Sequence, residues 1–158
     1  MEKHSPDIAV FTETWANNKL PRLHEAYTAL STPHAPYQGV AILVKSKFRT
    51  IPLDANNWSP FLMCCKVYTT SKHFLIIIGA YLQPQSHALR LSELKSLIRR
   101  TQTSFPTAGV VVIGDLNMPI DNATVEATSL GLKCFTFAPG TRLQNDTWST
   151  LDYFWSTL

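Results

Sequence analysis

The sequence lacks any hydrophobic run long enough to cross a membrane, and it lacks a secretion signal at its start. A membrane-spanning helix needs about 20 consecutive apolar residues. The first ten residues, MEKHSPDIAV, contain no apolar core of the kind that a signal peptide has. We therefore expect an intracellular protein, or a domain of one, that has no membrane partner.

Cysteine is scarce, and its spacing argues against the common cysteine-based sites. The three cysteines are Cys64, Cys65 and Cys134, and no C-x-x-C pair occurs. The five histidines are scattered along the chain, so the pattern does not favour a zinc site. Unpaired cysteines of this kind fit a reducing compartment, where they pack as small hydrophobic residues.

Charge is also modest. The formal net charge is +3, charged residues make up 16% of the chain, and hydrophobic residues make up 45%. This balance is typical of a globular protein and excludes a disordered one. The small positive excess tolerates a polyanionic partner without requiring one. With neither repeats nor low-complexity tracts, residues 1–158 are expected to form a single domain.

The hydrophobic pattern predicts many strands and few helices. Leucines and an isoleucine at helical spacing predict a helix over 87–102, and shorter helices are expected over 21–30 and 121–130. A hairpin is predicted where TTSK joins the two strands before the longest helix. Hairpin-linked strands favour mixed or antiparallel sheets, packed together with helices outside. The expected strands are 7–12, 38–46, 61–69, 73–82, 110–115, 133–137 and 148–155.

Polar residues mark the ends of four of these strands, and loops held by rigid strands are where chemistry concentrates. They are Glu13, Tyr81, the Asp115–Asn117 pair, and Asp152. Asp115 and Asn117 are two residues apart, so we place them on one face of one strand.

Each of these residues also has a purely structural interpretation. Glu13 can be solvated where its strand leaves the core, and Tyr81 can pack with its hydroxyl in water. Asp115 and Asn117 are common turn formers, and Asp152 can hold a strand end through a local hydrogen bond. No single residue decides between the two interpretations.

Taken together, five segments resemble the endonuclease/exonuclease/phosphatase superfamily, which includes DNase I-like nucleases. The similarity is greatest to the apurinic-endonuclease-like domain of non-LTR retrotransposon polyproteins, which also carry reverse transcriptase. The resemblance implies an α+β fold, a four-layer α/β/β/α sandwich in which two mixed β-sheets pack face to face with helices outside. The five segments are DIAVFTETW, QGVAILVKS, GAYLQP, VVIGDLN and STLDYF.

The resemblance also implies hydrolysis of a phosphodiester in target-site DNA with Mg²⁺ or Mn²⁺. Glu13 would be a metal ligand, and Asp115 would orient or deprotonate the attacking water. Asn117 would donate to a phosphate oxygen, and Tyr81 would hydrogen-bond to the phosphate or to the attacking water. Asp152 would orient a histidine further along the chain.

The sequence departs from that family's pattern at both ends. No Ser-Asp-His motif follows Asp152, and no asparagine-bearing strand precedes Asp7. We therefore interpret the 158 residues as an incomplete domain with weak or undetectable activity on its own. Other domains of a longer polyprotein are possible partners, and action on genomic DNA would require a nuclear location.

Two alternatives stay open at the level of sequence. The first is a phosphoinositide or another phosphoester as the substrate, because the chemistry at phosphorus is shared. The second is a catalytically inactive remnant or a binding scaffold. Basic residues that would contact phosphates, or that are simply solvated, are Lys45, Lys47, Arg49, Arg99 and Arg100.

Overall fold

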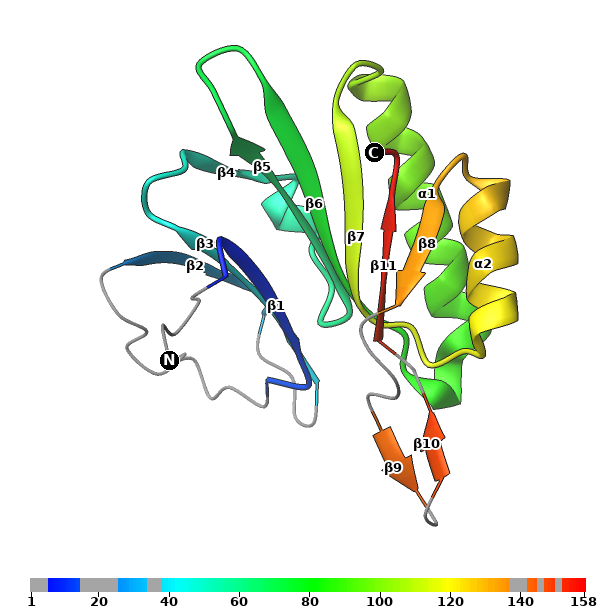
Figure 1. Cartoon of the computed structure of the whole chain (residues 1–158). Coiled ribbons are helices and arrows are strands. Elements are labelled where there is room, and N and C mark those ends of the chain that lie inside the picture. Colours follow the sequence, from blue (N-terminus) through cyan, green and yellow to red (C-terminus); the bar gives the residue numbers. More distant parts are fainter. Residues whose placement is uncertain (1–5, 15–25, 34–37, 137–141, 145–146, 150–151) are drawn as a thin grey trace, which may run out of the picture.

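Two β-sheets and two helices form the framework of the protein in this computed structural model (Figure 1). The structure describes residues 6–14, 26–33, 38–136, 142–144, 147–149 and 152–158. A separate two-stranded hairpin consists of β9 (Arg142–Gln144) and β10 (Thr147–Ser149).

The smaller sheet has three antiparallel strands in the order β1-β3-β2. Its central strand is buried along its whole apolar length, as the run of valine, isoleucine and leucine there predicts. Its strands are β1 (Ile8–Thr12), β2 (Tyr27–Ser31) and β3 (Val40–Lys45).

The larger sheet is mixed, with six strands in the order β4-β5-β6-β7-β11-β8. Among its described strands only β6 and β7 run parallel, and the long helix α1 (His87–Ser104) connects them, as a parallel crossover requires. Its strands are β4 (Thr50–Leu53), β5 (Leu62–Tyr68), β6 (Phe74–Tyr81), β7 (Gly109–Asp115), β8 (Lys133–Thr136) and β11 (Asp152–Ser156).

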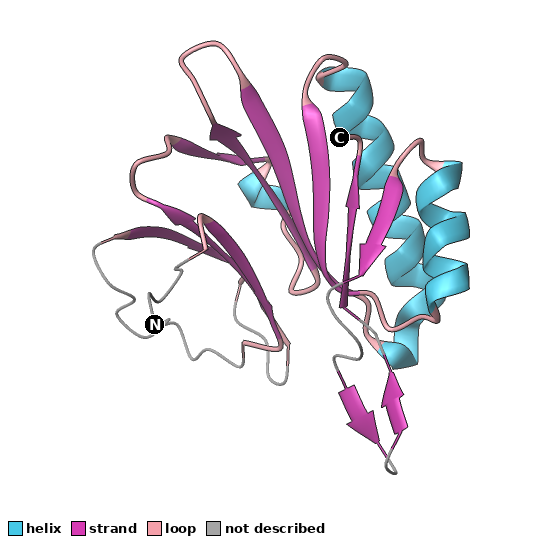
Figure 2. Ribbon diagram, in the orientation of Figure 1, coloured by secondary structure: helices cyan, strands magenta, loops and turns pink. Residues whose placement is uncertain are grey.

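The layers follow from which strand faces are apolar. Helices α1 and α2 (Ile120–Ser129) cover one face of the six-stranded sheet, and the three-stranded sheet packs on the other (Figure 2). Along β7, Val110 and Val112 are buried, whereas the alternate residues Val111 and Ile113 are half-buried. The predicted arrangement of two packed sheets with helices outside is therefore confirmed. Within the described residues, the helices lie on the six-stranded sheet alone.

Most predicted elements are present, including the hairpin between β5 and β6 and the helices predicted over 87–102 and 121–130. The helix expected over 21–30 is wrong where the structure describes it, because Tyr27–Ser31 pairs with β3 as a strand. The strand expected over 148–155 is two strands, β10 and β11, in separate sheets. Strand β4 was not predicted, because it is short and contains Pro52. An edge strand such as β4 tolerates proline. None of the described helices is both long and apolar enough to cross a membrane.

Candidate active site

The register of the six-stranded sheet brings three of the predicted residues to one end. Tyr81, the last residue of β6, stands beside Asp115, the last residue of β7. Asp152, the first residue of antiparallel β11, pairs with Asp115 from the other side. Strand pairing therefore places a phenol and two carboxylates on three adjacent strands, at the same end of those strands.

Glu13 lies at this end of the strands and comes from the segment that follows β1 of the three-stranded sheet. It follows β1 directly, and its backbone has φ of 51°, a left-handed conformation that non-glycine residues seldom adopt. The Tyr81 hydroxyl donates a hydrogen bond of 2.6 Å to Glu13 Oε1. The site thus bridges the two sheets, and residues 68 positions apart in the sequence meet there.

Tyr81 is held rigidly as a protonated donor. Its side chain is only 5% exposed, and its ring stacks on Phe61 with centroids 6.2 Å apart. Burial raises the pKa of Tyr81, and the hydrogen bond to Glu13 and the charges of Glu13 and Asp115 raise it further. The phenol therefore keeps its proton at neutral pH, so it can donate a hydrogen bond but cannot act as a base.

The stack on Tyr81 continues to Arg90 on the first turns of α1. The Arg90 guanidinium lies 4.0 Å from the centroid of the Phe61 ring, and it bonds Glu93 at 2.8 Å. The backbone N–H of Tyr81 also donates to the carbonyl of Phe61 at 2.8 Å. Neither Phe61 nor Arg90 follows from the sequence, because no local motif marks a contact between a loop and a helix.

Asp115 organises the turn that follows β7. Its Oδ1 accepts a hydrogen bond from the backbone N–H of Asn117 at 3.0 Å, which is the turn-forming arrangement weighed from the sequence. The placement of Asn117 on the same strand as Asp115 is wrong. Strand β7 ends at Asp115, and Asn117 has φ of 45°, so the alternation of a strand does not extend to it. Asparagine tolerates this conformation better than most residues.

Three long-range hydrogen bonds fix the same turn. The backbone N–H of Leu82 donates to the carbonyl of Asp115 at 2.9 Å. The carbonyl of Leu116 lies 2.9 Å from His87 Nε2, and the Tyr153 hydroxyl donates to the carbonyl of Met118 at 2.9 Å. These anchors come from the residue after β6, the start of α1 and β11, so the sequence alone did not reveal them.

Gly114 explains why glycine precedes the aspartate in the segment VVIGDLN. Its φ is 155°, and a Cβ at this position would collide with the carbonyl oxygen of Ala80 on β6. Only glycine therefore lets β6 and β7 approach closely enough to set Tyr81 beside Asp115.

The three carboxylates create a negative potential at the site. The charges of Asp152 and Asp115 contribute to raising the pKa of Tyr153, after burial and the neighbouring Cys134. Within the described residues, no group of three or more His, Cys, Asp or Glu side chains comes together as a metal cage. The donors fit a hard cation such as Mg²⁺, which usually takes one or two carboxylates and fills its shell with water and phosphate oxygens.

No family model matches the chain, and no curated protein matches it. Solved structures do match it. The endonuclease domain of TRAS1, a telomere-specific non-LTR retrotransposon, has a TM-score of 0.71 and 14% identity over 94% of this chain and 71% of that one. The 3′ phosphatase NExo from Neisseria, bound to a product DNA hairpin, has a TM-score of 0.68 and 17% identity over 98% of this chain and 77% of that one. A truncated TDP2 from Caenorhabditis elegans has a TM-score of 0.66 and 16% identity over 96% and 70%.

The chain has the DNase I-like fold. This confirms, at the level of fold, the resemblance to the endonuclease/exonuclease/phosphatase superfamily that the five segments predicted. Two of the neighbours, an endonuclease domain and a 3′ phosphatase, are phosphoester hydrolases by name.

Three of the basic residues proposed for phosphate contact, Lys45, Lys47 and Arg100, lie away from the site of this DNase I-like chain. Lys45 and Lys47 each approach Asp7 Oδ1 at 3.0 Å, at the opposite end of β1 from Glu13. These two lysines lower the pKa of Asp7. Arg100 is 13 positions beyond His87 along α1, which corresponds to roughly 20 Å of helix.

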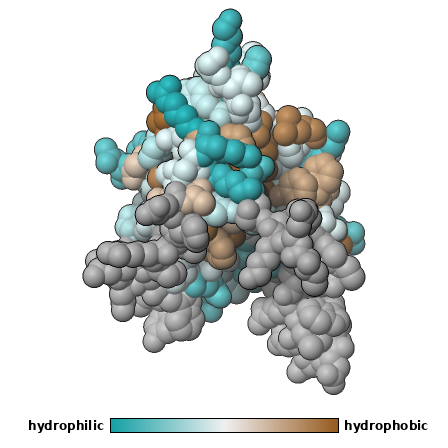
Figure 3. Space-filling view, turned by 60° about the vertical axis from the view of Figure 1, so that its left-hand side comes forward, coloured by the Kyte–Doolittle hydropathy of each residue, from teal (hydrophilic) through white to brown (hydrophobic). Residues whose placement is uncertain are grey.

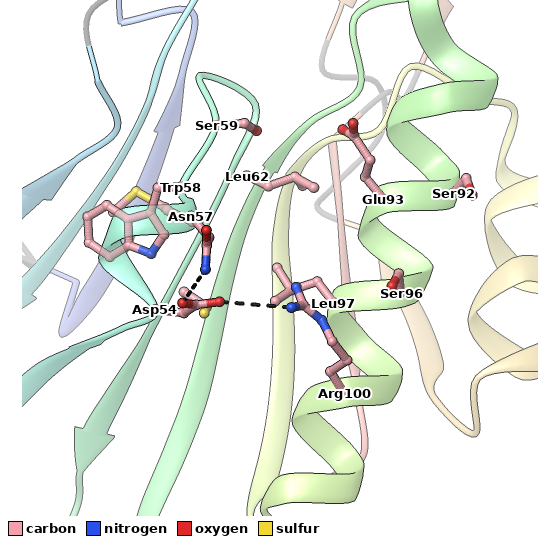
Figure 4. Close-up of a pocket in the computed structure, with 12 residues that line it drawn as sticks. Asp54, Asn57, Trp58, Ser59, Leu62, Ser92, Glu93, Ser96, Leu97 and Arg100 are labelled. Carbon is pink, nitrogen blue, oxygen red and sulfur yellow. Dashed lines mark hydrogen bonds and ion pairs between the residues drawn. The ribbon is translucent and has the colours of Figure 1, made fainter.

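A separate cavity of about 370 Å³ lies between α1 and the segment around the 3-10 helix Ala55–Asn57 (Figure 4). Asp54 lines this cavity, where its carboxylate accepts a hydrogen bond from the Asn57 amide at 2.6 Å and lies 3.9 Å from Arg100. None of the five predicted site residues lines this cavity. It is therefore distinct from the candidate active site.

Proposed function

We propose that the chain is a metal-dependent phosphodiesterase that nicks DNA, of the kind found in retrotransposon endonuclease domains. The observation that carries the proposal is the junction of Glu13, Tyr81 and Asp115 at one edge of a DNase I-like fold. The similarity to the TRAS1 endonuclease domain supports the choice of substrate.

In this proposal Glu13 holds a divalent cation, which would offset the charge on the phosphate during attack. Tyr81 fixes the orientation of the Glu13 carboxylate and presents a neutral phenol to the site. Asp115 orients the attacking water, or takes its proton, because its backbone is anchored on both sides. Asn117 donates to a phosphate oxygen from the turn after β7, and Asp152 completes the acidic edge.

We expect the reaction to be slow. Only two of the five histidines, His73 and His87, lie in the described part of the chain. His73 precedes β6 at the far end of the sheet, and the His87 ring contacts the carbonyl of Leu116. Without a histidine beside the phosphate the reaction would be slow, because loss of one member of a catalytic unit removes most of its rate.

The test is nicking of supercoiled plasmid with protein in excess over DNA, so that a single slow turnover is visible. We expect Mg²⁺- or Mn²⁺-dependent nicking that EDTA removes and that Asp115→Asn abolishes. Asp121→Asn is the matched control, because Asp121 lies in the exposed first turn of α2 and should leave the rate unchanged.

Parallel reactions with a 3′-phosphorylated DNA hairpin and a short-chain phosphoinositide address the other substrates. The hairpin is included because the neighbour NExo is a 3′ phosphatase, solved with a product DNA hairpin bound. A folded protein that hydrolyses none of the three with either metal would contradict the proposal and support the inactive remnant.

A further inference from the structure

The end of the six-stranded sheet opposite the candidate active site carries cations that the proposed reaction does not use. Tyr81 ends β6 at the site, and Phe74 begins β6 seven residues earlier, roughly 23 Å away along the strand. Arg49 precedes β4 at this far end, where its carbonyl accepts the backbone N–H of Tyr68 at 2.9 Å. Lys72 lies in the turn between β5 and β6. The length of the sheet therefore separates these cations from the site.

Three aromatic rings form a continuous row at this far end. The ring centroids of Tyr68 and Phe74 are 5.4 Å apart, and Phe74 meets Phe105 edge-on with centroids 5.9 Å apart. Tyr68 and Phe74 are cross-strand partners on β5 and β6, whereas Phe105 directly follows α1. All three side chains are half-buried, so part of the row is open to solvent.

Two cations lie over the rings of this row. The Arg49 guanidinium lies 5.1 Å from the centroid of the Tyr68 ring. Lys66 Nζ lies 4.0 Å from the centroid of Phe105 and 4.7 Å from that of Phe74. Lys66 shares a face of β5 with Tyr68, because the two are two residues apart in the strand. Attraction between a cation and a ring face therefore holds both positive charges in place.

The charge of Arg49, Lys66 and Lys72, here called the basic end, is not neutralised locally. Among the described residues, no carboxylate forms an ion pair with any of the three. Two lysines of the neighbouring segment between β3 and β4 share the one carboxylate of Asp7, which adds to the positive excess. The carboxylates of the candidate site lie at the opposite end of the sheet. A polyanion is therefore attracted to the basic end and repelled by the other.

The basic end is also accessible. Arg49 and Lys72 are exposed, and Lys66 is half-buried. The hairpin of β5 and β6 is uppermost in Figure 1, and hydrophilic side chains gather at the same upper end in the space-filling view (Figure 3). The three cations are therefore available to a partner from solution.

We propose that the basic end binds a single strand of nucleic acid. Arg49, Lys66 and Lys72 contact its phosphates, and the rings of Tyr68 and Phe74 offer stacking surface to its bases. Cations that follow a backbone beside aromatic rings are the combination by which proteins bind single strands without regard to sequence. This inference goes beyond the proposed hydrolysis and does not depend on it, because the bound strand lies at the far end of the sheet.

The arrangement of the row favours a single strand over a duplex. Arg49 and Lys66 come from neighbouring strands about 4.8 Å apart, so they are close enough to serve one phosphate backbone. Bases in a duplex stack on one another, whereas those of a single strand can be splayed onto aromatic side chains such as Tyr68. The rings would therefore contribute to the binding of a single strand alone.

The test is fluorescence anisotropy of a labelled oligothymidylate of about 15 nucleotides, the upper range of single-strand site sizes. The full chain is used in EDTA, so that neither metal binding nor hydrolysis contributes. Lys66→Met keeps an unbranched side chain over the rings without its charge. We expect Lys66→Met and Arg49→Gln each to weaken binding about threefold or more, and to lower the slope of log affinity against log salt by about 0.7.

Lys95→Gln is the matched control, because it removes the same charge from α1, where Lys95 binds Glu126 at 2.7 Å, and should leave the affinity unchanged. Arg49→Gln, at an exposed position, serves alone if Lys66→Met fails to fold. Backbone amide signals in NMR locate the bound strand. We expect those of Lys66 and Lys72 to shift.

Four outcomes would overturn the proposal. The first is shifts centred on Leu82 and Leu116, which adjoin the candidate active site. The second is wild-type affinity in the folded variants of Arg49 and Lys66. The third is equal binding of a polyaspartate of the same length, which would show that the surface accepts any polyanion. The fourth is equal or tighter binding of a duplex. Failure of the wild type to nick plasmid, with this binding intact, would contradict the proposed hydrolysis alone.

Discussion

The hydroxyl of Tyr81 donates a 2.6 Å hydrogen bond to Glu13 Oε1, and this bond links the end of β6 to the segment after β1. Tyr81 ends a strand of the six-stranded sheet, and Glu13 directly follows a strand of the three-stranded sheet. Any change in how the sheets pack would therefore alter the geometry of the site. The stack of Tyr81 on the buried Phe61 ring limits such change.

Tyr81→Phe removes the hydroxyl and keeps the stacked ring. We expect a loss of about 1 kcal/mol in the free energy of unfolding, since one hydrogen bond is removed and Glu13 is exposed to water. Nicking should fall by about tenfold or more, because the Glu13 carboxylate loses its anchor. Urea unfolding and plasmid nicking measure the two effects. Tyr68→Phe, at the far end of β5, is the matched control, and equal effects of the two variants would contradict the role of Tyr81.

Asp115 has a structural role and a proposed chemical role, and two substitutions separate them. Asparagine at this position retains an oxygen that can accept the N–H of Asn117, so Asp115→Asn should be nearly as stable as the wild type. Asp115→Ala loses the acceptor and should be less stable by about 1 kcal/mol. Both should lose activity. If Asp115→Asn retained wild-type nicking, Asp115 would not be the group that activates water.

Gly114→Ala should destabilise the fold strongly. The added methyl group meets the carbonyl of Ala80, and β6 and β7 must separate to admit it. A loss of about 2–4 kcal/mol is expected for strain of this kind in a core. Gly131→Ala is the control, because its φ is 71° but open space surrounds the new methyl group, so only about 1 kcal/mol should be lost. Thermal unfolding of both variants gives the comparison, and equal losses would show that the close approach of β6 and β7 does not limit stability.

The two buried cysteines, Cys64 and Cys65, make the free energy of unfolding depend on pH in the alkaline range. Burial raises the pKa of Cys64 to about 11 and that of Cys65 to about 12, from 9.0. Because these pKa values are higher in the folded state, their contribution to stability is intact below pH 9.0 and is lost as the pH rises towards 12. At about pH 8 a thiol reagent should modify half-buried Cys134 first. Modification of Cys64 and Cys65 at the same rate in the native state would contradict their burial.

Much of the candidate site was predictable because polar residues interrupt apolar strands. Glu13, Tyr81 and Asp115 lie at or directly after strand ends, as the sequence predicted, whereas Asp152 was expected inside a strand over 148–155 and is the first residue of β11. Their proximity was not predictable in the same way, since it depends on register. The pairing of Tyr81 and Asp115 is set by the parallel alignment of β6 and β7 across a helical crossover.

The errors arose where local pattern competes with longer-range structure. Residues 27–31 have a composition compatible with a helix, but pairing with β3 makes them a strand. Asn117 is two residues from Asp115, yet the hydrogen bond to Asp115 Oδ1 turns the chain out of the strand. His87 and Tyr153 anchor that turn from 29 and 35 residues away, distances over which a single sequence carries no signal.

The central claim is that a divalent cation binds where Glu13 and Asp115 approach the end of β6. The most direct test is titration of the folded chain with Mn²⁺, following paramagnetic broadening of its backbone amide signals by NMR. We expect broadening first at Leu82 and Leu116, which adjoin Tyr81 and Asp115. Glu13→Gln should weaken the affinity by about tenfold or more, while Asp7→Asn, at the other end of β1, should leave it unchanged. Broadening centred elsewhere, or equal affinity in the wild type and Glu13→Gln, would contradict the claim.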